Sequence, residues 1–237
     1  MPPIKTEPVD RQRAFDIQEL FFSATNKKGV IRSGNDVFLR VSGLERSELV
    51  GHAHNVVRHP DMPRAVFQLF WDYLKADKPI ASYVKNIASD GTYYWVMASA
   101  VSVGDGYVSI RVKPTSRFFD QAREMYADVR AVERRVEGGD PKRRKAAIQA
   151  GSGRLLELLR AAGFADYDAF MHAALPAEVT ARDAILGTPA HVRLVETPPG
   201  ARQELAQIVG ETASGHGHLD TLVQNLAEYA ALSSQLA

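Results

Sequence analysis

Apolar and polar positions in the first half of the chain follow the pattern of an antiparallel sheet. Apolar stretches rich in β-branched and aromatic residues occupy residues 80–88, 92–103 and 107–113. Asp90-Gly91 and Asp105-Gly106 separate them, and such pairs favour tight hairpin turns because glycine adopts positive φ easily and aspartate tolerates it. Residues 19–33 predict two shorter strands around a Lys-Gly turn. The pattern therefore predicts five strands.

Helical spacing lies between these two groups of strands. Asn35 or Asp36 can cap a short helix that ends at Gly43, because either side chain can accept hydrogen bonds from the free N–H groups at a helix start. A longer helix begins after Pro63, where apolar residues recur at helical spacing. These are Val66, Phe67, Phe70 and Leu74. The predicted fold class is α+β, with helices on one face of the sheet and a concavity between the two layers.

The second half of the chain has a helical composition. Alanine, leucine, arginine and glutamate dominate after about residue 113. We expect an exit helix over residues 116–139, stopped at Gly138-Gly139, and a helical region of unassigned role over residues 140–200. Within that region, a basic turn precedes an amphipathic helix, and residues 166–187 predict two short helical pieces. Apolar residues in 201–237 alternate at three- and four-residue spacing, which is typical of a coiled coil.

Composition excludes several classes of protein. The 237 residues carry a formal net charge of +1, so no broad basic field points to nucleic acid. The absence of cysteine excludes disulfides, cysteine zinc sites and covalent c-type haem attachment. The N-terminus does not resemble a signal peptide, and no apolar run reaches the roughly 18 residues of a membrane span. We expect a cytoplasmic protein.

The decapeptide HNVVRHPDMP, residues 54–63, concentrates the polar chemistry of this half. Its two prolines fix φ and stiffen the segment. Arg58 can present a forked donor to a phosphate or carboxylate, or can form an ion pair with Asp61 that ties the turn. His59 can hydrogen-bond a ligand, ligate haem as His52 or His54 could, or be satisfied by the local backbone. Asp61 can cap the turn.

Three motifs carry a resemblance to a known family. VSGLERSELVGHAHNVVRHPDMP, VKNIASDGTYYWV and YVSIRVKP resemble the PAS domain of bacterial aerotaxis receptors and related PAS-containing chemoreceptors, over residues 18–126. The resemblance implies a PAS sensor domain over residues 18–115, preceded by an N-terminal cap or flexible segment at residues 1–17. It also implies non-covalent FAD, a sensor of redox state, oxygen or energy level, and relay through C-terminal helices. The partners implied are a second copy of the chain and chemotaxis signalling proteins.

The family's cofactor-proximal positions match five residues. These are Asn35, Arg58, His59, Asp61 and Asn86. Asn86 carries both a donor and an acceptor, so rotation of its amide could follow a change in flavin protonation. One departure is Ile80, where FAD-binding receptors typically carry a tryptophan. Without cysteine, the light-driven cysteinyl–flavin adduct of photosensor PAS relatives is chemically impossible.

Two other readings stay open at this level. A haem- or small-ligand-binding PAS sensor is favoured by Ile80 if that residue opens the pocket. A cofactor-free PAS module could serve only dimerisation or docking. No nucleophile motif supports an enzyme. His216 and His218, among glycines, are more typical of a hinge than of a metal site, so no metal is expected.

Overall fold

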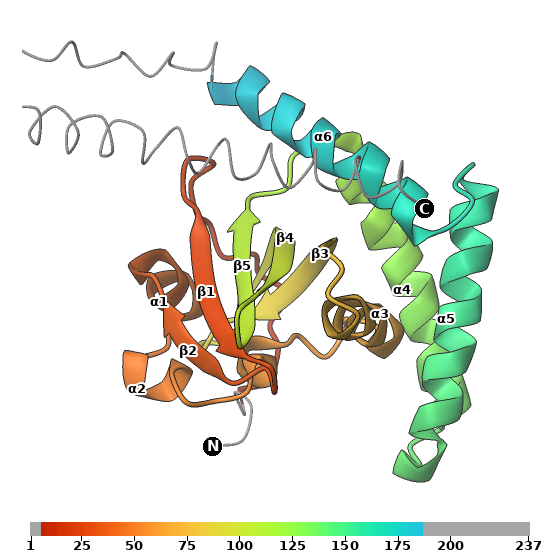
Figure 1. Cartoon of the computed structure of the whole chain (residues 1–237). Helices are drawn as coiled ribbons and strands as arrows, with labels where there is room; N and C mark the ends of the chain where they lie inside the picture. The colour runs from red at the N-terminus through yellow and green to blue at the C-terminus, as the bar shows by residue number, and fades with distance from the viewer. Residues whose placement is uncertain (1–5, 187–237) are drawn as a thin grey trace, which may run out of the picture.

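The computed structural model describes residues 6–186, which contain a five-stranded antiparallel sheet. The strands follow the order β2-β1-β5-β4-β3 across the sheet, so β2 and β3 are the edge strands and β5 lies in the centre (Figure 1). The strand bounds are Phe21–Asn26 for β1, Ile31–Gly34 for β2, Ile80–Ile87 for β3, Tyr93–Val103 for β4 and Gly106–Val112 for β5. The five predicted strands are confirmed.

One hairpin turn differs from its prediction by one position. Asp90 and Gly91 form the β3–β4 turn as expected, with φ of 84° at Gly91. Between β4 and β5 the turn residues are Gly104 and Asp105, whereas Gly106 already belongs to β5. A Cβ at Gly106 would lie 2.1 Å from the carbonyl oxygen of Thr25. Glycine is therefore needed here because β1 and β5 approach closely.

Four helical segments cover the inner face of the sheet. They are α1 (Asp36–Ser42), α2 (Arg46–Leu49), the 3-10 turn η1 (His54–Val57) and α3 (Arg64–Lys75). Asn35 caps α1, because its side chain accepts from the Phe38 N–H, and Gly43 ends it with φ of 67°. The predicted cap, stop and longer helix after Pro63 are confirmed.

The strands present different side chains to their two faces, as period-two alternation requires. Val84 and Asn86 of β3 face α3, whereas Tyr83 faces the other way. Tyr83 and Trp95 pack against Phe119 on that outer face, with ring centroids 5.7 and 5.5 Å apart. The sheet is therefore covered on both faces near β3 and β4, and not by helices on the inner face alone.

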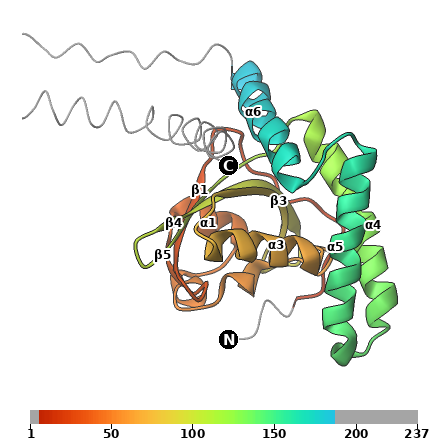
Figure 2. The ribbon, with the colours of Figure 1, turned by 45° about the vertical axis from the view of Figure 1, so that its right-hand side comes forward.

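The outer cover comes from the C-terminal helices. Their bounds are Arg117–Glu137 for α4, Pro141–Arg143 for the 3-10 turn η2, Arg144–Ala161 for α5 and Tyr167–Leu186 for α6. α4 and α5 form an antiparallel pair beside α3, and α6 crosses above them (Figures 1 and 2). No helix in the described part of the chain is long and apolar enough to cross a membrane.

The prediction of two short helical pieces over residues 166–187 is wrong. α6 is one helix with Pro176 inside it. Pro176 is exposed, whereas Phe170, Met171 and Leu175 are buried against the rest of the protein. Continuous burial of this face therefore outweighs the hydrogen bond that proline removes. The predicted coiled coil over residues 201–237 lies outside the described residues.

Candidate ligand-binding cavity

A cavity of about 360 Å³ lies between the inner face of the sheet, η1, α3 and the start of α5. Its apolar wall includes Val84, Ala98 and Ala100 from the central strands and Leu74 from α3. The small alanine side chains leave space above the sheet, and the aromatic rings of Phe67 and Trp71 close the opposite side. The concavity predicted between helices and sheet is confirmed.

The floor of the cavity contains buried polar groups that no protein atom satisfies. Thr25 on β1 and Ser109 and Arg111 on β5 are at most 9% exposed. Thr25 Oγ1, Ser109 Oγ and Arg111 Nη1 have no hydrogen-bond partner within the described protein. Leaving such a group unpaired costs about 1–3 kcal/mol, so these atoms are suited to a polar ligand.

Arg111 is held by neutral partners. Its Nη2 donates to Ser23 Oγ at 2.7 Å and contacts His54 Nε2 at 2.6 Å. Since a guanidinium can only donate, Nε2 of His54 must accept and is therefore unprotonated. Burial, and then the charge of Arg111, lower the pKa of His54 to about 3. Burial also lowers the pKa of Arg111 to about 10.

The mouth of the cavity is basic. Lys28, Arg58, Arg64 and Arg144 line it together with Arg111 deeper in, and the lining from residues 6–186 includes no aspartate or glutamate. Arg64 and Arg144 are each about 3.5 Å from Glu137, outside the lining, so their charge is partly balanced.

Arg58 and Asn86 are the two predicted site residues that the fold brings into the cavity. They face each other in an isolated antiparallel bridge between the decapeptide and β3. The Arg58 guanidinium stacks over Phe67 at 4.2 Å and donates to the Met62 carbonyl at 3.2 Å. Burial, followed by the nearby charge of Arg64, lowers the pKa of Arg58 to about 10. An Arg58–Asp61 ion pair is absent from the described contacts.

The other three predicted site residues lie outside the cavity lining. Asn35 Oδ1 accepts from the N–H groups of Phe22 and Phe38, and its Nδ2 donates to the Leu20 carbonyl. These three hydrogen bonds of the Asn35 side chain join β1 and the residue before it to α1.

His59 and Asp61 belong to a network behind the cavity. His59 Nδ1 accepts from the Asp61 N–H at 3.1 Å, and burial, then the charge of Lys85, lower the pKa of His59 to about 4. The carboxylate of Asp61 accepts from Lys85 at 3.0 Å and from Arg134 of α4 at 2.7 Å. These two residues connect the decapeptide to β3 and to the exit helix.

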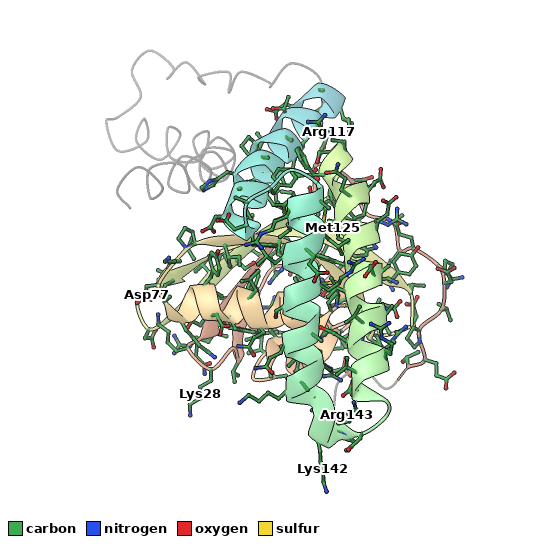
Figure 3. The ribbon with its side chains drawn as sticks, turned by 90° about the vertical axis from the view of Figure 1, so that its right-hand side faces the viewer. Lys28, Asp77, Arg117, Met125, Lys142 and Arg143 are labelled. Atoms are coloured by element: carbon green, nitrogen blue, oxygen red, sulfur yellow. The ribbon has the colours of Figure 1, made fainter. Side chains whose placement is uncertain are left out.

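The same helix makes two further contacts with the decapeptide region. Arg130 Nε donates to the Pro60 carbonyl at 3.0 Å. The buried carboxylate of Glu133 accepts from the N–H groups of Arg64 and Ala65, at 2.9 and 2.7 Å. Glu133 thus satisfies two of the free donors at the start of α3. Figure 3 shows α4 and α5 side by side, with α3 behind them.

The positions of the histidines limit which of them could bind haem in the cavity. Of His52, His54 and His59, only His54 lines the cavity, and its Nε2 is engaged by Arg111. No group of three metal-ligating side chains occurs among residues 6–186. Ile80 is buried in the core and outside the lining, so it does not open the cavity.

Sequence reasoning missed several lining residues. A signal for Arg111 was present, because Tyr107, Ser109 and Arg111 share one face of β5 by period-two spacing, and that face is buried. The contribution of α5 through Arg144 and Ile148 had no such signal, since it depends on how a distant helix folds back.

Solved structures similar to this chain include light-sensing and PAS domains. A LOV domain from an Erythrobacter litoralis blue-light activated histidine kinase is 15% identical, with 39% of this chain and 94% of that chain covered and a TM-score of 0.37. The light-state Aureochrome1 LOV structure is 18% identical, covering 44% and 88%, with a TM-score of 0.40. A PAS domain from Colwellia psychrerythraea is 15% identical, covering 40% and 85%, with a TM-score of 0.37.

Sequence comparison is more specific. A family model described as the PAS fold matches residues 31–110. The aerotaxis receptor of Escherichia coli (strain K12) is 40% identical over 114 residues, which are 46% of this chain and 22% of the receptor. The chain thus spans about a fifth of the length of that relative. Taken with the sheet order and the cavity, these matches identify the sheet-containing part of this chain as a PAS domain of the aerotaxis-receptor type.

Proposed function

We propose that this PAS domain is a cytoplasmic, non-enzymatic sensor of redox state, oxygen or energy level that binds FAD non-covalently. The observation that carries the proposal is the cavity with basic and hydroxyl groups that lack protein partners. Bound FAD would supply a ring system that accepts and releases electrons. The likeness to the aerotaxis receptor supports chemotaxis signalling proteins and a second copy of the chain as partners.

The donor set fits the chemical parts of FAD. The ring system is flat and apolar, with carbonyl oxygens and ring nitrogens on one edge. Val84, Ala98 and Phe67 offer apolar surface, and the amide of Asn86 can both donate and accept. The pyrophosphate carries negative charge, and the guanidinium groups of Arg58 and Arg64 at the mouth suit it.

The size of the cavity sets how much of FAD it would bury. Its volume of about 360 Å³ is near the lower end of the roughly 300–1,000 Å³ of small-molecule sites. Only the ring end would therefore be enclosed. The pyrophosphate and the second nucleotide would extend across the basic mouth toward α5, where Arg144 lies.

The relay to the C-terminal helices would pass through the decapeptide. Asn86 and Arg58 are bridged, and the next residues of the decapeptide contact α4 through Arg130 and Arg134. A hydrogen bond gained or lost at Asn86 would change the free-energy difference between the two states of the domain by about 1–3 kcal/mol. That amount shifts a two-state equilibrium appreciably, so α4 would respond to the state of the ring.

An absorption spectrum of freshly purified protein, before and after reduction with dithionite, tests this proposal. We expect the two visible bands of oxidised flavin, bleached on reduction, and FAD in the heat-released supernatant. A Soret band would instead assign a haem sensor. A colourless protein that stays colourless after incubation with FAD would overturn the sensor proposal in favour of a cofactor-free interaction module.

A further inference from the structure

Arg111 is a buried cation without a counter-charge. It is 4% exposed, and no carboxylate among residues 6–186 forms an ion pair with it. Its neutral contacts are Ser23, His54 and the ring of Phe38, 5.1 Å below the guanidinium. A buried charge is normally paired, because removal from water costs several kcal/mol. This cost points to a negative partner that is not part of the described protein.

The contacts leave one end of the guanidinium free. Nη2 is occupied by Ser23 and His54, whereas Nη1 is buried and unpaired. The hydroxyls of Ser109 and Thr25 are unpaired on the same sheet surface. Ser109 lies directly across from Ser23 in the β1–β5 register, so these groups come together on two neighbouring strands. Together they form a donor cluster on the cavity floor.

We propose that Arg111, with Ser109 and Thr25, binds the edge of the flavin ring on which negative charge develops, and thereby favours the reduced form. This inference rests on the proposed function. A neutral oxidised ring that takes two electrons from a reductant such as dithionite and one proton from water gains one net negative charge. The guanidinium stabilises that charge more than it stabilises the neutral ring, which raises the midpoint potential.

His54 has a positioning role in this arrangement. Its unprotonated Nε2 fixes Nη2 of Arg111 and adds no second positive charge. The guanidinium would therefore face the ring in a fixed orientation. No neighbouring carboxylate among residues 6–186 neutralises its charge.

Potentiometric titration of FAD-loaded protein tests the proposal with Arg111→Gln and Arg111→Lys. We expect Arg111→Gln to weaken binding of reduced FAD at least about tenfold relative to oxidised FAD, which lowers the two-electron midpoint potential by about 30 mV. Arg111→Lys should recover part of the shift because it keeps the charge. Arg32→Gln is the control, because Arg32 is an exposed sheet arginine paired with Asp105.

The outcomes separate this inference from the proposed function. Wild-type protein that binds no flavin overturns both, and its spectrum alone shows that. Flavin binding by all variants with unchanged potentials overturns the role of Arg111 and leaves the FAD sensor standing. If Arg111→Gln folds but takes up no flavin, recovery of binding by Arg111→Lys supports the anion subsite, and failure of the lysine variant overturns it. If the glutamine variant does not fold, Ser109→Ala must lower the potential, or the inference is wrong.

Discussion

Single polar side chains build this cavity in two different ways. Arg58 and Asn86 line the cavity directly. Asn35 lies outside the lining and supports the cavity by joining β1 to α1. Asn35 could not be separated from the ligand-facing residues by sequence, because an asparagine before a helix suits both a cap and a ligand contact. The distinction has consequences for stability that can be measured.

Replacing Asn35 by alanine should lower the free energy of unfolding by about 1–3 kcal/mol, because it leaves the N–H groups of Phe22 and Phe38 without their acceptor. Urea denaturation of the ligand-free protein measures the change. Asp36→Asn is the matched control, since Asp36 is exposed in the first turn of the same helix. Unchanged stability together with lost flavin binding would show that Asn35 acts on the ligand instead.

The low pKa of His54, about 3 against an ordinary 6.5, has a direct consequence for stability. The folded protein takes up this proton less readily than the unfolded chain, so the contribution of His54 is complete above pH 6.5. It is lost progressively as the pH falls from 6.5 toward 3. We expect denaturation midpoints to drop across this range and to drop less in His54→Gln.

His172→Gln is the control for that measurement, because His172 is partly exposed on α6 and outside the cavity. This variant removes an imidazole that does not contact Arg111 and does not line the cavity. The pKa of His59 is also lowered, to about 4, so His59 contributes part of the dependence of stability on pH in both variants. An identical slope in wild type and His54→Gln would refute the buried neutral imidazole.

At the scale of elements, two buried glutamates each connect a C-terminal helix to the start of an earlier helix. Glu133 of α4 accepts from the start of α3. Glu178 of α6 accepts from the N–H groups of Thr115 and Ser116 at the start of α4, and from the Tyr83 hydroxyl at 2.7 Å. Carboxylates are favourable at helix N-termini, where free N–H groups point outward. α4 and α6 thereby each hold the beginning of an earlier helix.

Glu133→Gln should destabilise the protein by about 1–3 kcal/mol, because one of two carboxylate acceptors becomes an amide donor facing a buried N–H group. Thermal unfolding followed by circular dichroism measures the loss. Glu124→Gln, on the exposed side of α4, should leave the transition unchanged. If both variants unfold like the wild type, α4 does not hold α3 through this carboxylate, and the proposed relay loses its strongest contact.

For the whole molecule, local patterns predicted the sheet, the helix cap and the concavity, because strand alternation and turn residues are local signals. The register error at Gly106 and the continuity of α6 depended on packing against distant segments. Arg111 meets Ser23, 88 positions away, and Arg144 reaches the cavity from α5. Such contacts depend on the topology of the fold. Residue types alone therefore identified Arg58 and Asn86 as site candidates but could not predict the other residues that line the cavity with them.

The claim that the basic cavity binds FAD is tested most directly by titrating ligand-free protein with FAD and with riboflavin. Arg58 lines the mouth, where the pyrophosphate would lie, and a charge-assisted hydrogen bond contributes about 1.5–3 kcal/mol. We expect wild type to bind FAD at least about tenfold more tightly than riboflavin. Arg58→Gln should remove that preference, while Lys75→Gln, exposed at the end of α3, should keep it. Equal affinities for the two flavins in wild type, or no binding of either, would show that the basic cavity is not an FAD site.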